Sequence, residues 1–536
     1  MPEKEYCLLY EPWIRTLRPD GKTEEVSLLG VFERAHKFLD LAGELPTQDI
    51  AVMRLLLAIL HAVFARYDFD GKYAPISSPG IALSRWKELW DRDAFPMPLI
   101  EAYLKSYEER FYLFHPERPF YQVPEIGDAT GYTAAKLNGE MSESGNKLRL
   151  FPQRSGDGKN RLRYAEAARW LLYVNAFDDT SAKPKGKGLE SPGVGWLGKL
   201  GLIAAKGENL FETLLLNMVL LRDGSNELWG TEVPVWEAEK VKSNERTRVS
   251  LPDNPSQLLT LQSRRLMLER KDESVTGYLL LGGDFFAKEN AVNEQMTVWR
   301  NAAQKVDDRP EYHPKRHDPS RQLWRDFPGL IAQTAGNRRP GVVSWLARLK
   351  EEQLISNSQF RFQISAVKYG DKDFFVDDVF SDSLSFNAGL LTALGENWVS
   401  CILEEINITE KLVAHVGLLA QSIAKAAGDS DGIAQKNAAK EQAYYQLDEP
   451  FREWLKGINV ERDEVSDACQ RWWTRESQIV RALGAAIIKQ AGPRALVGRT
   501  IMENKKAYHY SAPEAYNRFL RSISSSDGLK NGGKND

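Results

Sequence analysis

The pattern of apolar and polar positions divides the chain into two parts. In the first part, short apolar or alternating stretches are separated by turns rich in proline and glycine, such as the turn at 18–22 after a predicted strand at 6–14. The stretch 50–66 is apolar on every side, which predicts a helix buried in a core. A strand pair with a tight turn is predicted over 360–376. These features predict a mixed α/β domain.

The second part follows a helical period. Apolar residues recur every three to four positions in four stretches, at 388–406, 410–427, 432–454 and 463–490. Helices of this length with short connections are typical of a bundle. We therefore predict an α+β protein with a large mixed α/β domain at 1–380 and a four-helix bundle at 381–523. The polar, glycine-rich end at 524–536 is predicted to be disordered.

The cysteines and the hydropathy pattern restrict where the protein works. Cys7, Cys401 and Cys469 are far apart and form no CxxC pair, so we expect reduced thiols in the cytoplasm and no metal site. The N-terminus lacks the apolar segment of a signal peptide. The longest apolar run, 55–65, is too short to cross a bilayer, so no membrane association is expected.

Positive charge is concentrated in two segments of a chain whose net charge is −3. Residues 136–206 contain 13 Lys and Arg against 7 Asp and Glu, and residues 300–350 contain 11 against 5. Each segment therefore carries +6, and the rest of the chain carries −15. Such a distribution favours contact with a polyanion at one place, although a solvated surface with chance clustering remains an alternative.

Local motifs for small-ligand chemistry lack the context that they need. GVGWLG at 193–198 matches GxGxxG, but a proline and a polar loop precede it instead of a strand. His313 and His317 have the spacing of helical metal ligands, yet prolines interrupt that helix. His61 lies in the buried stretch and is expected to be a hydrogen-bonded core histidine. We predict neither a cofactor nor a bound metal.

Several stretches, in order, resemble a known family. They are EPWI at 11–14, FYLFHPERPFYQV at 111–123, LLLNMVLL at 214–221 with PVW at 234–236, and AKEQAYYQLDEPF at 439–451. Together they resemble the CasA-type large subunit of the type I-E CRISPR surveillance complex, Cascade, over essentially the full length. The resemblance implies a non-catalytic subunit with a mixed α/β domain and a C-terminal four-helix bundle.

The same resemblance implies a role in antiviral defence. The expected subunit recognises the short PAM beside the target in double-stranded DNA, through the minor groove, where readout is degenerate. It helps to open the duplex so that crRNA can pair, and it provides the docking site for a helicase-nuclease. The implied partners are the DNA target, the 5′ end of the crRNA, the other Cascade subunits and the transiently bound helicase-nuclease.

The resemblance also assigns candidate DNA-binding residues to four places. They lie in a loop at 146–153, in the glycine-rich loop at 186–198, at a lysine-bearing finger and at a wedge. The residues are Asn146, Lys147, Arg149, Leu150, Phe151 and Gln153 in the first loop, Lys187, Gly193 and Gly195 in the second, Arg270 and Lys271 at the finger, and Trp324 and Arg325 at the wedge.

Two other functions fit parts of the pattern. A structural scaffold could use the basic loops to contact only guide RNA or other subunits, because charge does not distinguish RNA from DNA. A metal-dependent nuclease could use His115, or His313 with His317, but no paired acidic nuclease motif or GxSxG elbow supports an enzyme.

Overall fold

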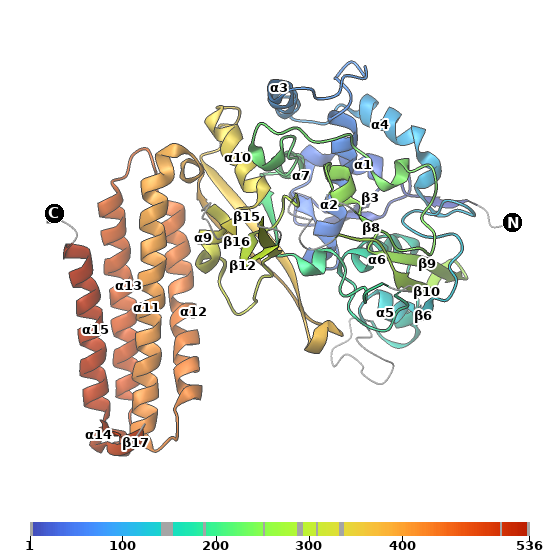
Figure 1. The fold of residues 1–536 in the computed structure, drawn as a ribbon. Helices are drawn as coiled ribbons and strands as arrows, with labels where there is room; N and C mark the ends of the chain where they lie inside the picture. Colours follow the sequence, from blue (N-terminus) through green and yellow to red (C-terminus); the bar gives the residue numbers. More distant parts are fainter. Residues whose placement is uncertain are drawn as a thin grey trace. The chain divides into compact units, whose positions relative to one another are not determined.

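The computed structural model describes residues 4–140, 154–185, 189–249, 252–286, 293–306, 309–331, 337–503 and 506–532 (Figure 1). The chain forms two compact units. The first comprises Met1–Arg321, Gly329–Ser356 and Phe360–Ser383, and the second comprises Gln322–Pro328, Asn357–Gln359 and Leu384–Asp536. The main division at Ser383 falls close to the expected boundary at 380, but two short segments of the earlier chain belong to the second unit.

The first unit contains small sheets rather than one large sheet. β1 (Glu5–Cys7) pairs antiparallel with β5 (Tyr112–Phe114). A three-stranded antiparallel sheet has the strand order β3 (Thr23–Val26), β2 (Ile14–Leu17), β4 (Asp40–Leu41). Another has the order β6 (Thr130–Thr133), β10 (Ser274–Gly282), β9 (Arg264–Lys271). β13 (Arg309–Pro314), β12 (Trp299–Val306) and β14 (Asn337–Arg338) form another sheet, and β8 (Arg248–Val249) pairs in parallel with β11 (Phe285–Phe286). The strand pair predicted at 360–376 is β15 (Gln359–Tyr369) with β16 (Val376–Asn387), and β7 (Leu202–Lys206) lies on the other side of β15.

Ten helices of the described chain precede the long C-terminal helices. They are α1 (Leu28–Glu33), α2 (Pro46–Phe64), α3 (Pro79–Trp90), α4 (Met97–Ser106), α5 (Ala134–Leu137), α6 (Tyr164–Phe177), α7 (Leu210–Leu216), α8 (Pro255–Leu259), α9 (Phe327–Ile331) and α10 (Gly341–Glu351). The central one is α2, which packs against α4, α6, α7 and α8. Its apolar side chains are buried on all sides, as the sequence pattern predicts.

The burial of α2 distinguishes a core helix from a membrane-spanning helix of the same composition. The helix is long and apolar enough to cross a membrane, but 94% of its apolar window is buried inside the protein. It also carries Arg54, whose guanidinium pairs with Glu294 through two bonds of 2.9 and 2.8 Å. A buried charge of this kind needs such a partner. These features are those of a core helix.

The second unit is built from long helices (Figure 1). α11 (Glu396–Ala427) packs against α12 (Ile433–Gly457), α13 (Val465–Lys489) and α15 (Ala512–Gly532), and α13 packs against α12 and α15. The short α14 (Pro493–Val497) and the hairpin of β17 (Arg499–Glu503) and β18 (Lys506–Tyr510) connect α13 to α15. The described residues of this unit thus form a four-helix bundle.

Two predicted details of the bundle are wrong. The stretches 388–406 and 410–427 are not separate helices, because α11 runs through Asn407 without a break. Asn407 is exposed, and buried apolar residues continue on the opposite face before and after it, so one weak helix former does not end the helix. The fourth helix is α15, which extends to Gly532 and includes most of the tail that was predicted to be disordered.

Candidate nucleic-acid interface

Seven of the thirteen predicted contact residues lie outside the described residues. They are Asn146, Lys147, Arg149, Leu150, Phe151, Gln153 and Lys187. The other six fall in three places: the C-terminal side of the glycine-rich loop, the tip of the β9–β10 hairpin and a segment of the second unit. These places differ in what the structure allows their side chains to contact.

One guanidinium holds the two sides of the glycine-rich loop together. Arg246 Nη1 donates to the carbonyl oxygens of Lys185 and Glu190, both at 2.7 Å, and its Nε donates to Gly283 O at 2.9 Å. Lys185 and Glu190 flank positions 186–188, so the ends of this segment are tied to the same side chain. Arginine suits this role because its donors lie in a fixed plane.

A second arginine anchors the C-terminal side of the same loop. Arg264 Nη2 donates to Gly193 O at 2.6 Å, and its Nε pairs with Asp178 Oδ2 at 2.5 Å. Lys183 Nζ lies 3.1 Å from the same carboxylate oxygen. Burial alone would raise the pKa of Asp178, but Lys183 and Arg264 beside it hold the pKa below its usual value. We call these five residues, Asp178, Lys183, Gly193, Arg246 and Arg264, the loop base.

The two glycines of the predicted interface are not equivalent. Gly193 is half-buried and has a φ of +62°, and a Cβ there would meet only the Lys199 side chain, at 3.9 Å. A partner could therefore approach its backbone. Gly195 is buried, and a Cβ there would clash with the carbonyl oxygen of Ala176. The prediction that Gly195 leaves room for DNA is wrong, because the chain's own backbone at Ala176 occupies the space beside it.

Exposed cations gather beside the β9–β10 hairpin. Backbone hydrogen bonds of 3.0 and 2.9 Å join Leu162 to Val275 and place residues 161–163 next to β10. Arg161 and Arg163, whose side chains are 52% and 64% exposed, therefore lie on the same sheet as Lys271, at the exposed end of β9. We call Arg161, Arg163 and Lys271 the edge strip. It combines residues from two stretches that are about a hundred positions apart.

The other predicted residue of the finger is already engaged. Arg270 forms an ion pair with Glu5, and its guanidinium lies 4.4 Å from the centre of the Phe114 ring. Arg270 could contact a phosphate only if this ion pair with Glu5 were broken. Lys271, in contrast, is exposed and has no ion-pair partner among the residues that the structure describes.

The predicted wedge is not at the surface. Trp324 is 0% exposed, its indole stacks on Phe451 of α12 with ring centres 4.3 Å apart, and its Nε1 donates to Asp448 at 3.0 Å. Arg325 pairs with Glu410 of α11 at 2.7 Å and lies over the Tyr444 ring. The prediction that Trp324 and Arg325 open the duplex is therefore contradicted by their burial and pairing inside the second unit.

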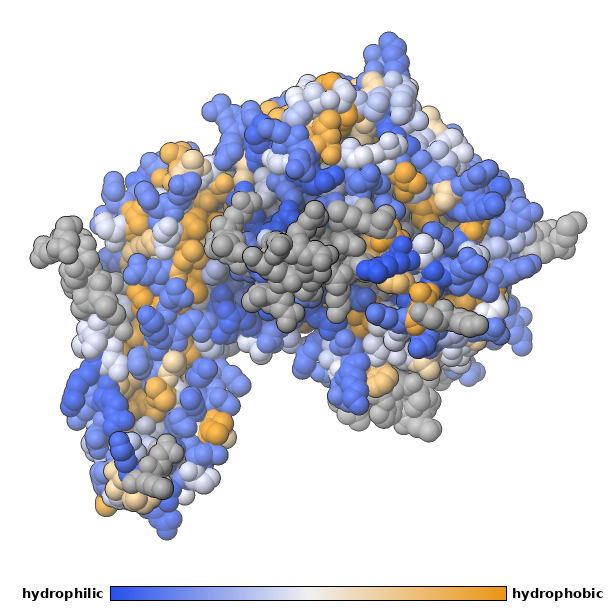
Figure 2. Space-filling model, in the orientation of Figure 1, coloured by the Kyte–Doolittle hydropathy of each residue, from blue (hydrophilic) through white to orange (hydrophobic). Residues whose placement is uncertain are grey.

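The charge count also overestimates the positive charge that a polyanion can reach. Many cations of the two basic segments pair with acids. Lys136 pairs with Asp179 of its own segment, and several others pair with acids outside both segments: Arg169 with Glu25 and Glu44, Lys206 with Asp40, Arg316 with Asp373, and Arg338 with Asp223. Parts of the two segments do lie together, because the carbonyl oxygen of Leu202 accepts a bond from His317 at 3.2 Å. On the face that Figure 2 shows, hydrophilic residues dominate the first unit and hydrophobic residues occur in small separate groups.

Two buried features differ from their predictions. His61 is buried, but its Nδ1 has no hydrogen-bond partner and lies 3.8 Å from Glu232 Oε1, beside a cavity of about 200 Å³. Burial lowers the pKa of His61 to about 3 and raises that of Glu232 to about 7.

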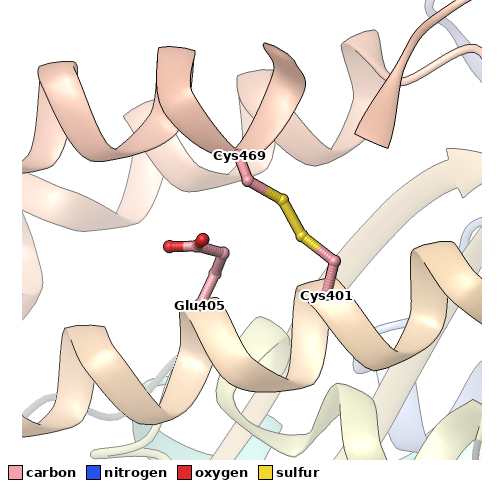
Figure 3. A group of neighbouring side chains, drawn as sticks. All are labelled: Cys401, Glu405 and Cys469. Carbon is pink, nitrogen blue, oxygen red and sulfur yellow. A yellow bond between two sulfur atoms is a disulfide. The ribbon is translucent and has the colours of Figure 1, made fainter. Parts of the chain in front are cut away.

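Cys401 and Cys469 are joined by a disulfide, so the prediction of reduced thiols is wrong for this pair (Figure 3). Cys7 is a buried free thiol.

Sequence reasoning missed the arginines that build the loop base. Arg246 lies in a polar stretch without a motif, and the carboxylate that Arg264 pairs with, Asp178, lies 86 residues earlier in the chain. The one usable signal was the Arg264–Arg265 pair directly before the apolar residues 266–268, since arginines that are buried with such a run need buried acceptors.

Comparison with known proteins defines the class of this fold. The solved structure of Cse1 from Thermobifida fusca superimposes with a TM-score of 0.83, at 30% identity and with 98% of each chain covered. A chain from a structure described as a CRISPR RNA-guided surveillance complex matches with a TM-score of 0.74, at 15% identity, covering 97% of this chain and all of that one. The CRISPR-associated protein CasA/Cse1 of Thermus thermophilus is 27% identical over 432 residues, which are 79% of this chain and 78% of that protein.

The family model for CRISPR-associated protein Cse1 matches residues 8–483. The chain therefore belongs to the Cse1 family, as the sequence resemblance predicts. The α+β fold with a helical C-terminal unit is likewise that of the solved Cse1 structures.

Proposed function

We propose that this chain is the large subunit of a type I-E Cascade complex and recognises the PAM in double-stranded target DNA. It acts in the cytoplasm without catalysis of its own, destabilises the duplex for crRNA pairing and provides the docking site for the helicase-nuclease. Membership of the Cse1 family supports the assignment to such a complex. The fold likeness to a chain of an RNA-guided surveillance complex agrees with it.

The observation that carries the recognition proposal is the loop base. Arg246 and Arg264 bind backbone carbonyls on both sides of positions 186–188 and at Gly193. Glycine lets the backbone come close to a base edge, and Arg264 holds Gly193 in place for such an approach. In this proposal Gly193 reads the groove, while Lys187 and the 146–153 loop contact the backbone or the bases.

The edge strip supports a second part of the proposal. All three cations are exposed, and the carboxylate beside Arg161, that of the exposed Asp272, lies 3.8 Å away, so a phosphate can replace it at low cost. Arg163 pairs with the partly buried Glu25 at 3.1 Å, a contact that a phosphate would have to replace. Phosphate contacts position a protein on DNA without reading sequence. We assign this positioning role to Arg161, Arg163 and Lys271.

The test is a gel shift with the complex reconstituted from this chain, crRNA and the partner subunits. Target duplexes carry randomised flanks at the expected PAM position, and the bound fraction is sequenced. We expect a few flanks to be enriched, and Gly193→Asp to abolish the enrichment. Gly71→Asp is the matched control, because Gly71 also has a positive φ, of +79°, and an open surrounding. Equal retention of every flank would overturn PAM recognition and favour a scaffold.

A further inference from the structure

Two helices of the second unit bring together a group of metal-ligand atoms from residues that take no part in the candidate interface (Figure 3). Cys401 and Glu405 are one turn apart on α11, and Cys469 faces them from α13. One ligand atom from each residue lies within 4.8 Å of the others. Both cysteines are half-buried, so small molecules can reach them, whereas the Glu405 side chain is 2% exposed.

The chemistry of these three groups suits a zinc-like cation. Zn²⁺ binds thiolate sulfur at about 2.3 Å and carboxylate oxygen at about 2.0–2.2 Å, which places tetrahedral ligands roughly 3.4–3.8 Å apart. Three protein ligands leave a fourth position for water. The cation would also compensate the negative charge that two neighbouring thiolates bring to the same place.

The spacing of the helices fits a bridging ion. The Cα atoms of Cys401 and Cys469 are 7.2 Å apart. Cα separations in disulfides are usually about 4.4–6.8 Å. An ion between the two sulfur atoms lengthens the link and suits a separation of this size.

We propose that the reduced Cys401–Cys469 pair, together with Glu405, forms a site for a soft divalent cation of the zinc class. The disulfide and the cation are alternative occupants of the same place. A low-molecular-weight disulfide such as glutathione disulfide converts one state to the other. The two thiolates lose two electrons and form the S–S bond, glutathione disulfide takes up the electrons and becomes two glutathione thiolates, and the cation is released.

The consequence concerns the bundle. Either occupant links α11 to α13, but only the cation can be withdrawn without a redox reaction. A ligand that binds the folded state alone raises its stability in proportion to the logarithm of its concentration above Kd. The reduced, metal-free chain is therefore the least stable of the three forms.

The experiment uses the full chain, which is first reduced with a phosphine. The phosphine is then removed under anaerobic conditions. Co²⁺ is the probe, since its thiolate charge-transfer and d–d bands report sulfur ligation, and Zn²⁺ is then added to displace it. We expect one equivalent of Co²⁺ to bind. Cys401→Ser and Cys469→Ser should lose the thiolate band, and Glu405→Gln should weaken binding by about tenfold or more.

Two controls keep the result decisive. Cys7→Ser should leave the Co²⁺ spectrum unchanged, because Cys7 is a buried thiol of the first unit. Oxidised wild-type chain should bind no Co²⁺, which tests the same cysteines without a substitution that could disturb folding. Circular dichroism confirms that each form is folded. A folded, reduced wild-type chain without a thiolate band, or a band that persists in both serine variants, would overturn the proposal.

Discussion

In the loop base, Arg264 is 1% exposed and donates to the Asp178 carboxylate and the Gly193 carbonyl, which lie 86 and 71 positions earlier in the chain. In the edge strip, Arg163 is 64% exposed and pairs with the partly buried Glu25. Both are arginines next to a glycine- or charge-rich stretch, and a charge count treats them alike. A buried ion pair that loses one partner leaves an uncompensated charge, while an exposed pair contributes little. Exposure therefore separates cations that build the interface from cations that can bind DNA.

The largest effect is expected at the residue whose predicted role proved wrong. Trp324→Ala removes an indole that is completely buried against Phe451, so we expect the second unit to lose about 3–5 kcal/mol of unfolding free energy. Denaturant unfolding followed by far-UV circular dichroism measures this. A change within about 0.5 kcal/mol, as at a surface site, would restore the wedge as an exposed element.

A comparable loss is expected when the loop base is broken. Arg264→Met leaves Asp178 buried with one cation fewer, at a cost of about 3–5 kcal/mol. Arg163→Met, the matched change in the edge strip, should cost less than about 1 kcal/mol. Thermal and denaturant unfolding of both variants give the two values. Equal values for the two would remove the distinction between the regions.

Asp178 and Glu232 extend the comparison to carboxyl groups. Both are buried, but the cations around Asp178 lower its pKa, whereas burial raises that of Glu232 to about 7. As the pH rises from 4.5 to 7, the unfolded chain releases the proton of Glu232 before the folded chain does, so the stability due to the protonated carboxyl is lost over this range.

A neutral substitute avoids this loss. Glu232→Gln should be more stable than the wild type by about 3 kcal/mol at pH 8, and the gain should vanish near pH 4.5. Unfolding at several pH values measures the difference between the two chains. A gain that does not depend on pH would show that packing, and not ionisation, is responsible.

Much of the fold was accessible from the sequence because it depends on local patterns. The all-apolar stretch predicts α2, and the helical period after residue 384 predicts a bundle, since both rest on positions close in the chain. The merged helix α11 and the length of α15 were missed, because a single polar residue or a polar composition does not decide where a packed helix ends.

The candidate site was predictable only in part. The glycine-rich loop could be located by composition, but Arg246 and Arg264 reach it from 61 and 71 residues away. Whether Gly195 faces DNA or Ala176, and whether Trp324 faces a base or Phe451, depends on tertiary contacts that no local pattern contains. The same is true of Cys401 and Cys469, which are 68 positions apart.

The most direct test of the account is the salt dependence of target binding by the reconstituted complex. The variant carries Arg161→Gln, Arg163→Gln and Lys271→Gln, and the control removes three exposed cations elsewhere in the first unit, with Lys87→Gln, Arg92→Gln and Lys105→Gln. Each phosphate contact contributes about 0.9 to the slope of log K against log salt. We expect the edge-strip variant to lose about 2 to 3 from this slope without a change in flank preference, and the control to retain the wild-type slope. Equal slopes for both variants would contradict the assignment of the edge strip to DNA.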